Sequence, residues 1–346
     1  MFMQLSYKIK KTIIRNILKK RKKTQGFDAV LAETYRIADD ADANINNSYY
    51  FSAHNLEGQS IFIRLGLRGD KQSEIWFTYR DNDLFLSYPT ELCPIEASPL
   101  YVECIEVEKK WKIIFKGEMQ SLTNKETRMQ VYFEGVFEAT APIFDFFYHA
   151  DPEPMASAIA REKWNKAFFQ EIQKNNQTHY EQAGKLTGNL SINQIQKQIN
   201  LFALRDHSFG KRDWNYMDKH MWLMALTENG DALNISTVSY PALSGIAVGN
   251  FNRKGKVFDV IHFHTSNDLI NNGKGADHFM LQAKLNTGEL LQITVERDAE
   301  VVYSFAQGQY ILREGMGSFT INGEKAKGII EFGFNKDKNR WYRNNK

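Results

Sequence analysis

Residues 59–81 read QSIFIRLGLRGDKQSEIWFTYRD, and this stretch shows the pattern that recurs through most of the chain. Two runs rich in β-branched and aromatic residues flank a short segment that contains glycine and aspartate. Such runs favour strands, whereas glycine and aspartate are typical of the turns between them. The stretch therefore predicts two neighbouring strands of an antiparallel sheet.

Runs of this kind follow one another at intervals of about ten residues, as in antiparallel meanders, barrels and sandwiches. The first series also includes SYYFSAHN, LFLSYPT, LYVECIEVE, KWKIIFKGEM and MQVYFEGVFEAT. The second series includes HYEQAGKLTGNLSI, QKQINLFALRDHS, HMWLMALTEN, ALNISTVSY, SGIAVGNFN, KVFDVIHFHTS, HFMLQAKLN, LLQITVERD and SFTINGEKAKGIIEFGF. Between the two series, Pro152 and Pro154 precede apolar residues at helical spacing, which predicts a helix over 153–176.

These patterns predict a mainly β protein with two tandem antiparallel β barrels or sandwiches and one bridging helix. The expected parts are a basic segment at 1–26, a first β domain at 27–178 that ends with the helix, and a second β domain at 179–346.

The charge of the chain is unevenly distributed. Residues 1–26 contain nine Lys or Arg and no acid, and the other 35 basic and 41 acidic residues leave a net charge of −6. The sequence pI of 8.6 therefore comes from the N-terminal segment, and nucleic acid is not an expected partner. No stretch approaches the roughly 18 apolar residues of a membrane span, and no secretory signal is recognisable.

Residues 8–23 predict a basic amphipathic helix. Ile9, Ile13 and Ile17, with Ile14 and Leu18, form an apolar stripe beside many lysines and arginines. Such a helix binds an anionic membrane surface, or it is a solvated tail or docks on the acidic body. The chain has only two cysteines, so we expect a cytoplasmic protein, located at the inner membrane face if the helix binds lipid.

The common motifs of catalysis are absent from the sequence. It contains no P-loop, no GxGxxG before a helix, no GxSxG and no HExxH. His262 and His264 would share one face of a strand, but no spacing motif supplies a third ligand. We therefore expect no metal and no other cofactor.

Residues 204–214, LRDHSFGKRDW, concentrate charge in a strand-like region. On a strand, Arg205, His207 and Phe209 share one face, whereas Asp206 and Ser208 share the other. Gly210 permits a turn or bulge, after which Arg212, Asp213 and Trp214 would fold back beside the first residues. Asp213, rather than Asp206, is then the expected partner of His207.

Two interpretations of this stretch remain open. In the first and favoured one, the two Arg and two Asp form a structural network, because buried charges persist only when they are paired. In the second, a histidine with a carboxylate and a cation beside an aromatic cavity moves protons or stabilises developing charge.

The motif RDHSFGKRDW resembles the DHxWGxRDW-like signature of the two-domain, lipocalin-like proteins grouped with carotenoid 1,2-hydratase and AttH-type proteins. The chain is similar in further segments to the N-terminal module of animal phosphoenolpyruvate-synthase-like proteins. The resemblance spans residues 44–335 and implies two tandem lipocalin-like β barrels, with a cavity for an apolar ligand at or near their contact. The phosphotransfer domains of those animal proteins have no counterpart here.

The resemblance maps the motif His to His207, its preceding Asp to Asp206 and its Trp to Phe209. The hydratase also has a Tyr-x-Asp pair, which our placement aligns with Asn234, Ile235 and Ser236, so neither phenol nor acid is present. This difference argues against carotenoid hydration by the same mechanism.

Two functions follow as expectations. In the first, the protein hydrates, isomerises or cyclises an isoprenoid-, polyene- or lipid-like molecule without metal. The expected catalytic residues are His207, Asp213, Arg205, Arg212 and Asp206, and the expected wall residues are Phe209, Trp214, Trp222 and Tyr240. In the second, the protein binds or carries a lipid-like molecule at the membrane surface without catalysis.

Overall fold

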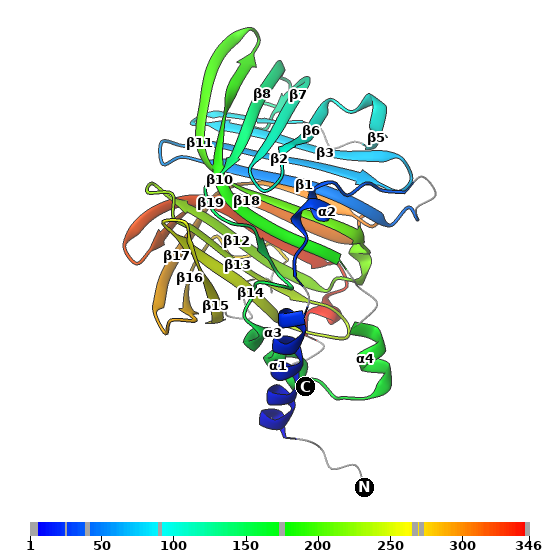
Figure 1. Ribbon diagram of the computed structural model, residues 1–346. Coiled ribbons are helices and arrows are strands. Elements are labelled where there is room, and N and C mark those ends of the chain that lie inside the picture. Colours follow the sequence, from blue (N-terminus) through cyan, green and yellow to red (C-terminus); the bar gives the residue numbers. More distant parts are fainter. Residues whose placement is uncertain are drawn as a thin grey trace.

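The computed structural model describes residues 6–24, 26–38, 42–88, 92–172, 177–264, 269 and 273–342. The chain forms two antiparallel β structures that pack against each other, and three of its helices gather at one end of the second (Figure 1). The prediction of a mainly β fold is confirmed. No helix among the described residues is both long enough and apolar enough to cross a membrane.

The first β structure is formed by residues 45–211. Its sheet follows the order β11-β1-β2-β3-β4-β7-β8-β10-β9, and β10 also pairs with β11, which joins the sheet into a barrel. Its strands are β1 (Ile45–His54), β2 (Gln59–Arg68), β3 (Gln72–Asp81), β4 (Leu84–Ser87), β5 (Leu92–Pro94), β6 (Leu100–Glu106), β7 (Lys110–Ser121), β8 (Arg128–Ala139), β9 (Phe144–Asp145), β10 (Gln177–Ile192) and β11 (Ile195–Lys211).

The second β structure is a closed barrel of eight sequential strands. Its strands are β12 (Lys219–Thr227), β13 (Ala232–Ser239), β14 (Ile246–Arg253), β15 (Lys256–His264), β16 (His278–Leu285), β17 (Leu290–Phe305), β18 (Tyr310–Ile321) and β19 (Glu324–Asn335). β19 pairs with β12 and closes the ring.

The domain boundary differs from the prediction. β10 and β11 were expected in the second domain, but they pair with β8 and β1 and complete the first barrel. The second barrel therefore begins at Lys219. Residues 204–211 of the segment 204–214 belong to the last strand of the first barrel, and residues 212–214 begin the connection between the barrels.

The predicted helix over 153–176 is two helices, α3 (Pro152–Arg161) and α4 (Lys166–Ile172). Glu162, which ends α3, has extended backbone angles, and Asn165 then accepts a hydrogen bond from the Phe168 amide at 2.8 Å. Asparagine favours helix starts because its side chain pairs with a free amide of the first turn. Residues 173–176 lie outside the described part of the chain.

The N-terminal helix α1 (Tyr7–Thr24) packs against α3 at one end of the second barrel (Figure 1). Ile14 is buried there with Ala156 and Ile159, and Lys11 pairs with Glu153. The short helix α2 (Ala29–Glu33) instead contacts the first barrel, where Glu33 is buried. Of the alternatives for residues 8–23, docking on the body is thus observed.

Three apolar cores hold the barrels. One fills the first barrel, one fills the second, and a third lies between them. In the third core the indole ring of Trp76 on β3 stacks on the phenol ring of Tyr303 on β17, with centroids 3.9 Å apart. Leu204 of β11 belongs to the same core, so one face of β11 is buried inside a barrel and the other between barrels.

Trp76→Ala should remove the central ring of this contact. Truncation of a buried tryptophan typically costs about 3–5 kcal/mol of unfolding free energy, and urea denaturation would measure it. The matched control is Tyr101→Ala, because Tyr101 on β6 is 51% exposed and should cost within about 0.5 kcal/mol. Equal losses in both variants would contradict a stabilising contact at Trp76.

Candidate functional site between the barrels

The alternation predicted for residues 204–209 is present in β11. Arg205 and His207 point into the first barrel, where they contact Trp111. Leu204 and Asp206 point toward the second barrel. The motif is therefore divided between two environments, and its residues do not form one site.

His207 lies in a closed network inside the first barrel. Its Nδ1 is 2.6 Å from the hydroxyl of Tyr180, its Nε2 is 2.7 Å from Oδ1 of Asn47, and its ring stacks on Tyr49. Burial lowers the pKa of His207 well below its usual range, so the ring is neutral. Both nitrogens are satisfied by uncharged partners, and His207 is not among the residues that line the cavity described below.

Arg205 and Phe209 hold α2 on the first barrel. Arg205 pairs with the buried Glu33, and its Nε donates to Oε1 of Gln182 at 2.9 Å. The ring of Phe209 stacks on Tyr35, with centroids 4.2 Å apart. These contacts support the structural interpretation of these two residues.

The expected pairing of Asp213 with His207 is corrected by the structure. Gly210 has a φ of +121°, which favours glycine, but the strand continues in register to Lys211 opposite Ile45. The chain therefore does not fold back at Gly210. Asp213 lies beyond the strand and accepts a hydrogen bond from the Asn215 amide at 2.9 Å.

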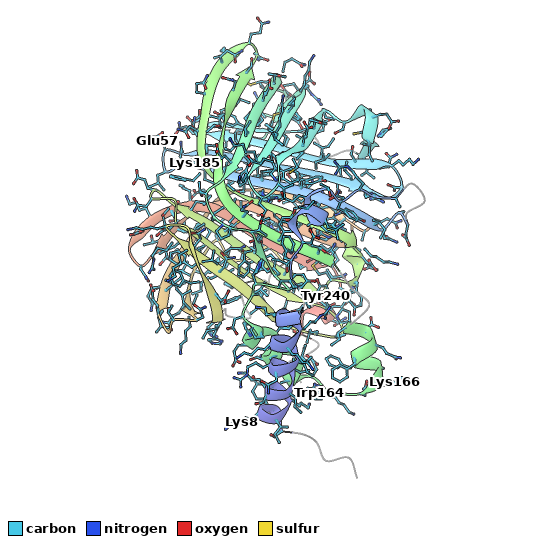
Figure 2. All side chains as sticks on the ribbon, viewed as in Figure 1. Lys8, Glu57, Trp164, Lys166, Lys185 and Tyr240 are labelled. Carbon is cyan, nitrogen blue, oxygen red and sulfur yellow. The ribbon has the colours of Figure 1, made fainter. Side chains whose placement is uncertain are left out.

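A cavity of about 160 Å³ lies between the barrels. Its aromatic walls include Trp76 from the first barrel and Trp214 from the segment that connects the barrels. The second barrel contributes Trp222 on β12 and Tyr240, which directly follows β13. Three of the four expected wall residues thus line it, and Phe209 does not. Figure 2 labels Tyr240 on the side of the second barrel that faces the helices.

Two arginines enter this cavity over tryptophan rings. Arg212 lies over Trp214 at 5.0 Å and donates to Ser208 at 3.0 Å, and burial lowers its pKa. Arg64 lies over Trp76 at 4.7 Å, and its Nη2 is buried without a hydrogen-bond partner. Asp206 on β11 is the other predicted catalytic residue that lines this cavity.

A buried acidic cluster of the second barrel reaches the cavity wall through His220 and Glu331. His220 on β12 places Nε2 2.5 Å from Oε1 of Glu331 on β19 and Nδ1 2.6 Å from the hydroxyl of Tyr310 on β18. Glu314 on β18 lies directly opposite Glu331, and Tyr50 of the first barrel donates to Glu314 at 2.5 Å. The last hydrogen bond crosses the contact between the barrels.

Burial sets the protonation of this acidic cluster. Burial, and then the charge of Glu331, raises the pKa of Glu314 well above its usual range, and burial also raises the pKa of Glu331. Burial lowers the pKa of His220 to about 4. At neutral pH the cluster therefore holds a neutral imidazole beside a carboxyl pair that retains a proton.

The two contacts of His220 permit proton exchange. In one tautomer, the hydroxyl of Tyr310 donates to Nδ1 of His220, and Nε2 of His220 donates to Glu331. In the other, a protonated Glu331 donates to Nε2, and Nδ1 donates to the oxygen of Tyr310. The hydroxyl of Tyr310 can then donate to the sulfur of Met217, which lies 3.3 Å away. Both tautomers satisfy the contacts. The arrangement can thus give or take a proton at the cavity.

The comparisons with known proteins agree with this architecture. A family model described as "Domain of unknown function (DUF7064)" matches residues 33–336. The chain belongs to the DUF7064 family. No curated protein matches it.

Solved structures resemble this DUF7064 protein over most of its length. An AttH-like protein from Nitrosomonas europaea is 12% identical, with a TM-score of 0.51, and the match covers 89% of this chain and 99% of that one. Kievitone hydratase from Nectria haematococca is 10% identical, with a TM-score of 0.49 over 91% and 97% of the two chains. The structure of CghA with Sch210972 is 8% identical, with a TM-score of 0.48 over 84% and 89%.

The AttH-like structure confirms the lipocalin-like two-domain fold that the motif implied. The comparisons give no support to the closer resemblance to the module of phosphoenolpyruvate-synthase-like proteins. At these identities the shared property is the fold.

The acidic cluster was missed by sequence reasoning. His220, Glu314 and Glu331 are isolated in apolar strands, and the strand register that brings them together is not visible in the sequence. One signal was present: a glutamate within GIIEFGF is unusual for a buried strand. Gly333 is part of the same arrangement, because an added Cβ would lie 2.1 Å from the His220 ring.

The lowered pKa of His220 predicts a pH dependence of stability. As the pH falls from 6.5 toward 4, the unfolded state takes up the His220 proton first, so the folded state loses stability. At pH 4.5 this loss is about 2–3 kcal/mol. His220→Gln removes this titration. Between pH 7 and pH 4.5 its free energy of unfolding should therefore fall by about 2–3 kcal/mol less than that of the unmodified protein, as measured by urea denaturation.

The control for this prediction is His262→Gln, because His262 on β15 is exposed. It should retain the acid dependence of the unmodified protein. If the stability of the His220 variant depended on acid pH in the same way as that of the unmodified protein, His220 would not be held neutral in the folded state.

Proposed function

We propose that this DUF7064 protein binds an apolar, ring-bearing small molecule between its barrels and catalyses a proton-transfer reaction on it, such as a hydration, isomerisation or cyclisation. The observation that carries the proposal is the buried cluster of His220, Glu314 and Glu331 at the wall of an aromatic cavity. Buried carboxyl groups with raised pKa values are suited to act as acids near neutral pH.

The size and lining of the cavity define the ligand class. A volume of about 160 Å³ accommodates one ring-sized group, since a cavity of about 150 Å³ holds benzene. Arg64 Nη2 and Gln177 Nε2 belong to residues that line the cavity, and neither atom has a hydrogen-bond partner. Unpartnered buried donors favour a ligand oxygen, such as a hydroxyl or carbonyl group.

The groups at the cavity and those that support them have separate proposed roles. Glu331 transfers the proton, and His220 and Tyr310 exchange it with the rest of the cluster. Arg64 and Arg212 stabilise negative charge that develops on the ligand oxygen. Trp76, Trp214 and Trp222 hold the ring and can stabilise a cationic carbon through their faces. Arg205 and His207 keep the first barrel and α2 in place.

Glu331→Gln tests the chemistry. Mass spectrometry of apolar extracts from the purified protein identifies the bound molecule, and turnover is then followed with that molecule. Loss of a general acid should lower kcat by about 10²–10⁴-fold, with the dissociation constant changed far less. Unchanged turnover would refute the role of Glu331.

His207→Asn is the matched control, since Asn replaces a buried histidine outside the cavity. After correction for the folded fraction, it should retain kcat.

Binding itself is tested by calorimetric titration of p-cresol and toluene. Preference for p-cresol would support the oxygen-binding donors, whereas binding of neither would refute the proposed ligand class.

A second candidate function is attachment to an anionic membrane surface, which would bring the protein to apolar ligands. The observation that favours this function is that α1 packs on the body through only one of its sides. Ile9, Ile13 and Ile17 remain 47%, 39% and 55% exposed, and the exposed Lys8 and Lys19 belong to the same helix. Figure 2 shows Lys8 at the outer end of α1 and Trp164 beside it.

Ile13→Asp with Ile17→Asp should weaken sedimentation with phosphatidylserine vesicles at least about 5-fold, because exposed apolar area and lysine charge act together on membranes. The matched control is Val30→Asp with Leu31→Asp on α2, since these residues are 61% and 68% exposed. If both double variants bind vesicles like the unmodified protein, α1 is not a membrane contact.

A further inference from the structure

Three potential metal ligands converge on the first-barrel wall of the cavity. His179 and Glu181 are two residues apart on β10 and share one face, and Asp206 on β11 lies directly opposite Glu181. The nearest ligand atoms of the three side chains all lie within 4.8 Å of one another. His179 and Asp206 also line the cavity, so the group is accessible from it.

Glu181 is the unusual member of this group. It is 1% exposed, and neither of its carboxylate oxygens has a hydrogen-bond partner. Among the described residues, the ion-pair contacts of Glu181 and Asp206 are both with His179, at 3.9 Å for Glu181 Oε1. A buried carboxylate without a donor is costly unless a cation or a proton compensates it.

Arg212 and the ring of Phe146 are neighbours of this group. Arg212 lines the same cavity, where its Nη2 donates to Ser208 and its charge interacts with that of Asp206. The ring of His179 packs against Phe146, with centroids 4.5 Å apart, which limits its rotation while Nε2 faces Asp206. The group therefore presents one imidazole nitrogen and two carboxylates in a fixed position.

We propose that His179, Glu181 and Asp206 bind a divalent first-row metal ion, with Zn²⁺ or Mn²⁺ as the best-suited ions. One imidazole and two carboxylates match the ligand preferences of these ions, and their two negative charges balance the ion. Three protein ligands leave a position for an exogenous oxygen. That position lies on the cavity side, because His179 and Asp206 line the cavity.

The site differs from the sequence expectation of no metal, which rested on the pair His262 and His264. Those residues lie on β15, in the second barrel, whereas the proposed ligands come from the first barrel. If the proposed function also holds, the ion would bind the reacting water or the ligand oxygen opposite Glu331. The metal site itself does not depend on that function.

The test uses the full chain after removal of metals with a chelator. Equilibrium dialysis of the unmodified protein against Zn²⁺, with elemental analysis, should give about one bound ion per chain. Glu181→Gln and Asp206→Asn should each lower the affinity by at least about 10–100-fold, the loss seen when metal sites lose supporting groups. Zn²⁺ should raise the melting temperature of the unmodified protein and not that of these variants.

Glu314→Gln is the matched control, because Glu314 is equally buried on the opposite side of the contact. It should retain Zn²⁺ binding. If the ligand variants do not fold, anomalous diffraction from Zn²⁺-soaked crystals of the unmodified protein places the ion. Absence of stoichiometric binding, or an ion located elsewhere, would overturn the proposal.

These measurements need no cavity ligand. If no metal ion binds at this site, the role of Glu331 would therefore still be decided by the turnover measurement. Conversely, metal binding without turnover would support the site and count against the proposed reaction.

Discussion

The two-residue period of strand β11 is the constraint on which the rest of the structure depends. Because successive side chains point to opposite faces, Arg205 and His207 enter the first barrel while Leu204 and Asp206 meet the second. Both faces of this strand are buried from Ala203 to Ser208. The polar residues of that part therefore need partners, which α2, β1 and β10 supply to Arg205 and His207.

The same requirement explains why polar chemistry collects at the contact between the barrels. Water is largely excluded there, so the carboxyl groups of Glu314 and Glu331 and the ring of His220 favour their neutral forms. On the opposite wall, Glu181 lacks a donor altogether. The apolar core that joins the barrels thus also creates the conditions under which buried carboxyl groups retain protons.

Sequence reasoning recovered the properties that depend on local pattern. The strand runs, the β class and the alternation of 204–209 could be predicted, and the motif led to the correct fold. The domain boundary could not, since the runs of β10 and β11 look like those that follow, and only non-local pairing with β1 and β8 assigns them. Likewise, Glu33 reaches Arg205 from a distant helix, which no spacing rule indicates.

The segment that joins the barrels has a consequence for ligand size. Residues 212–218 are both the covalent connection and part of the cavity wall, through Arg212, Trp214 and Met217. The interior of each barrel is filled by its own core, so the space for a ligand is set by the spacing between the two bodies. In this fold the size of the cavity can therefore change through this short connection while both barrels keep their packing.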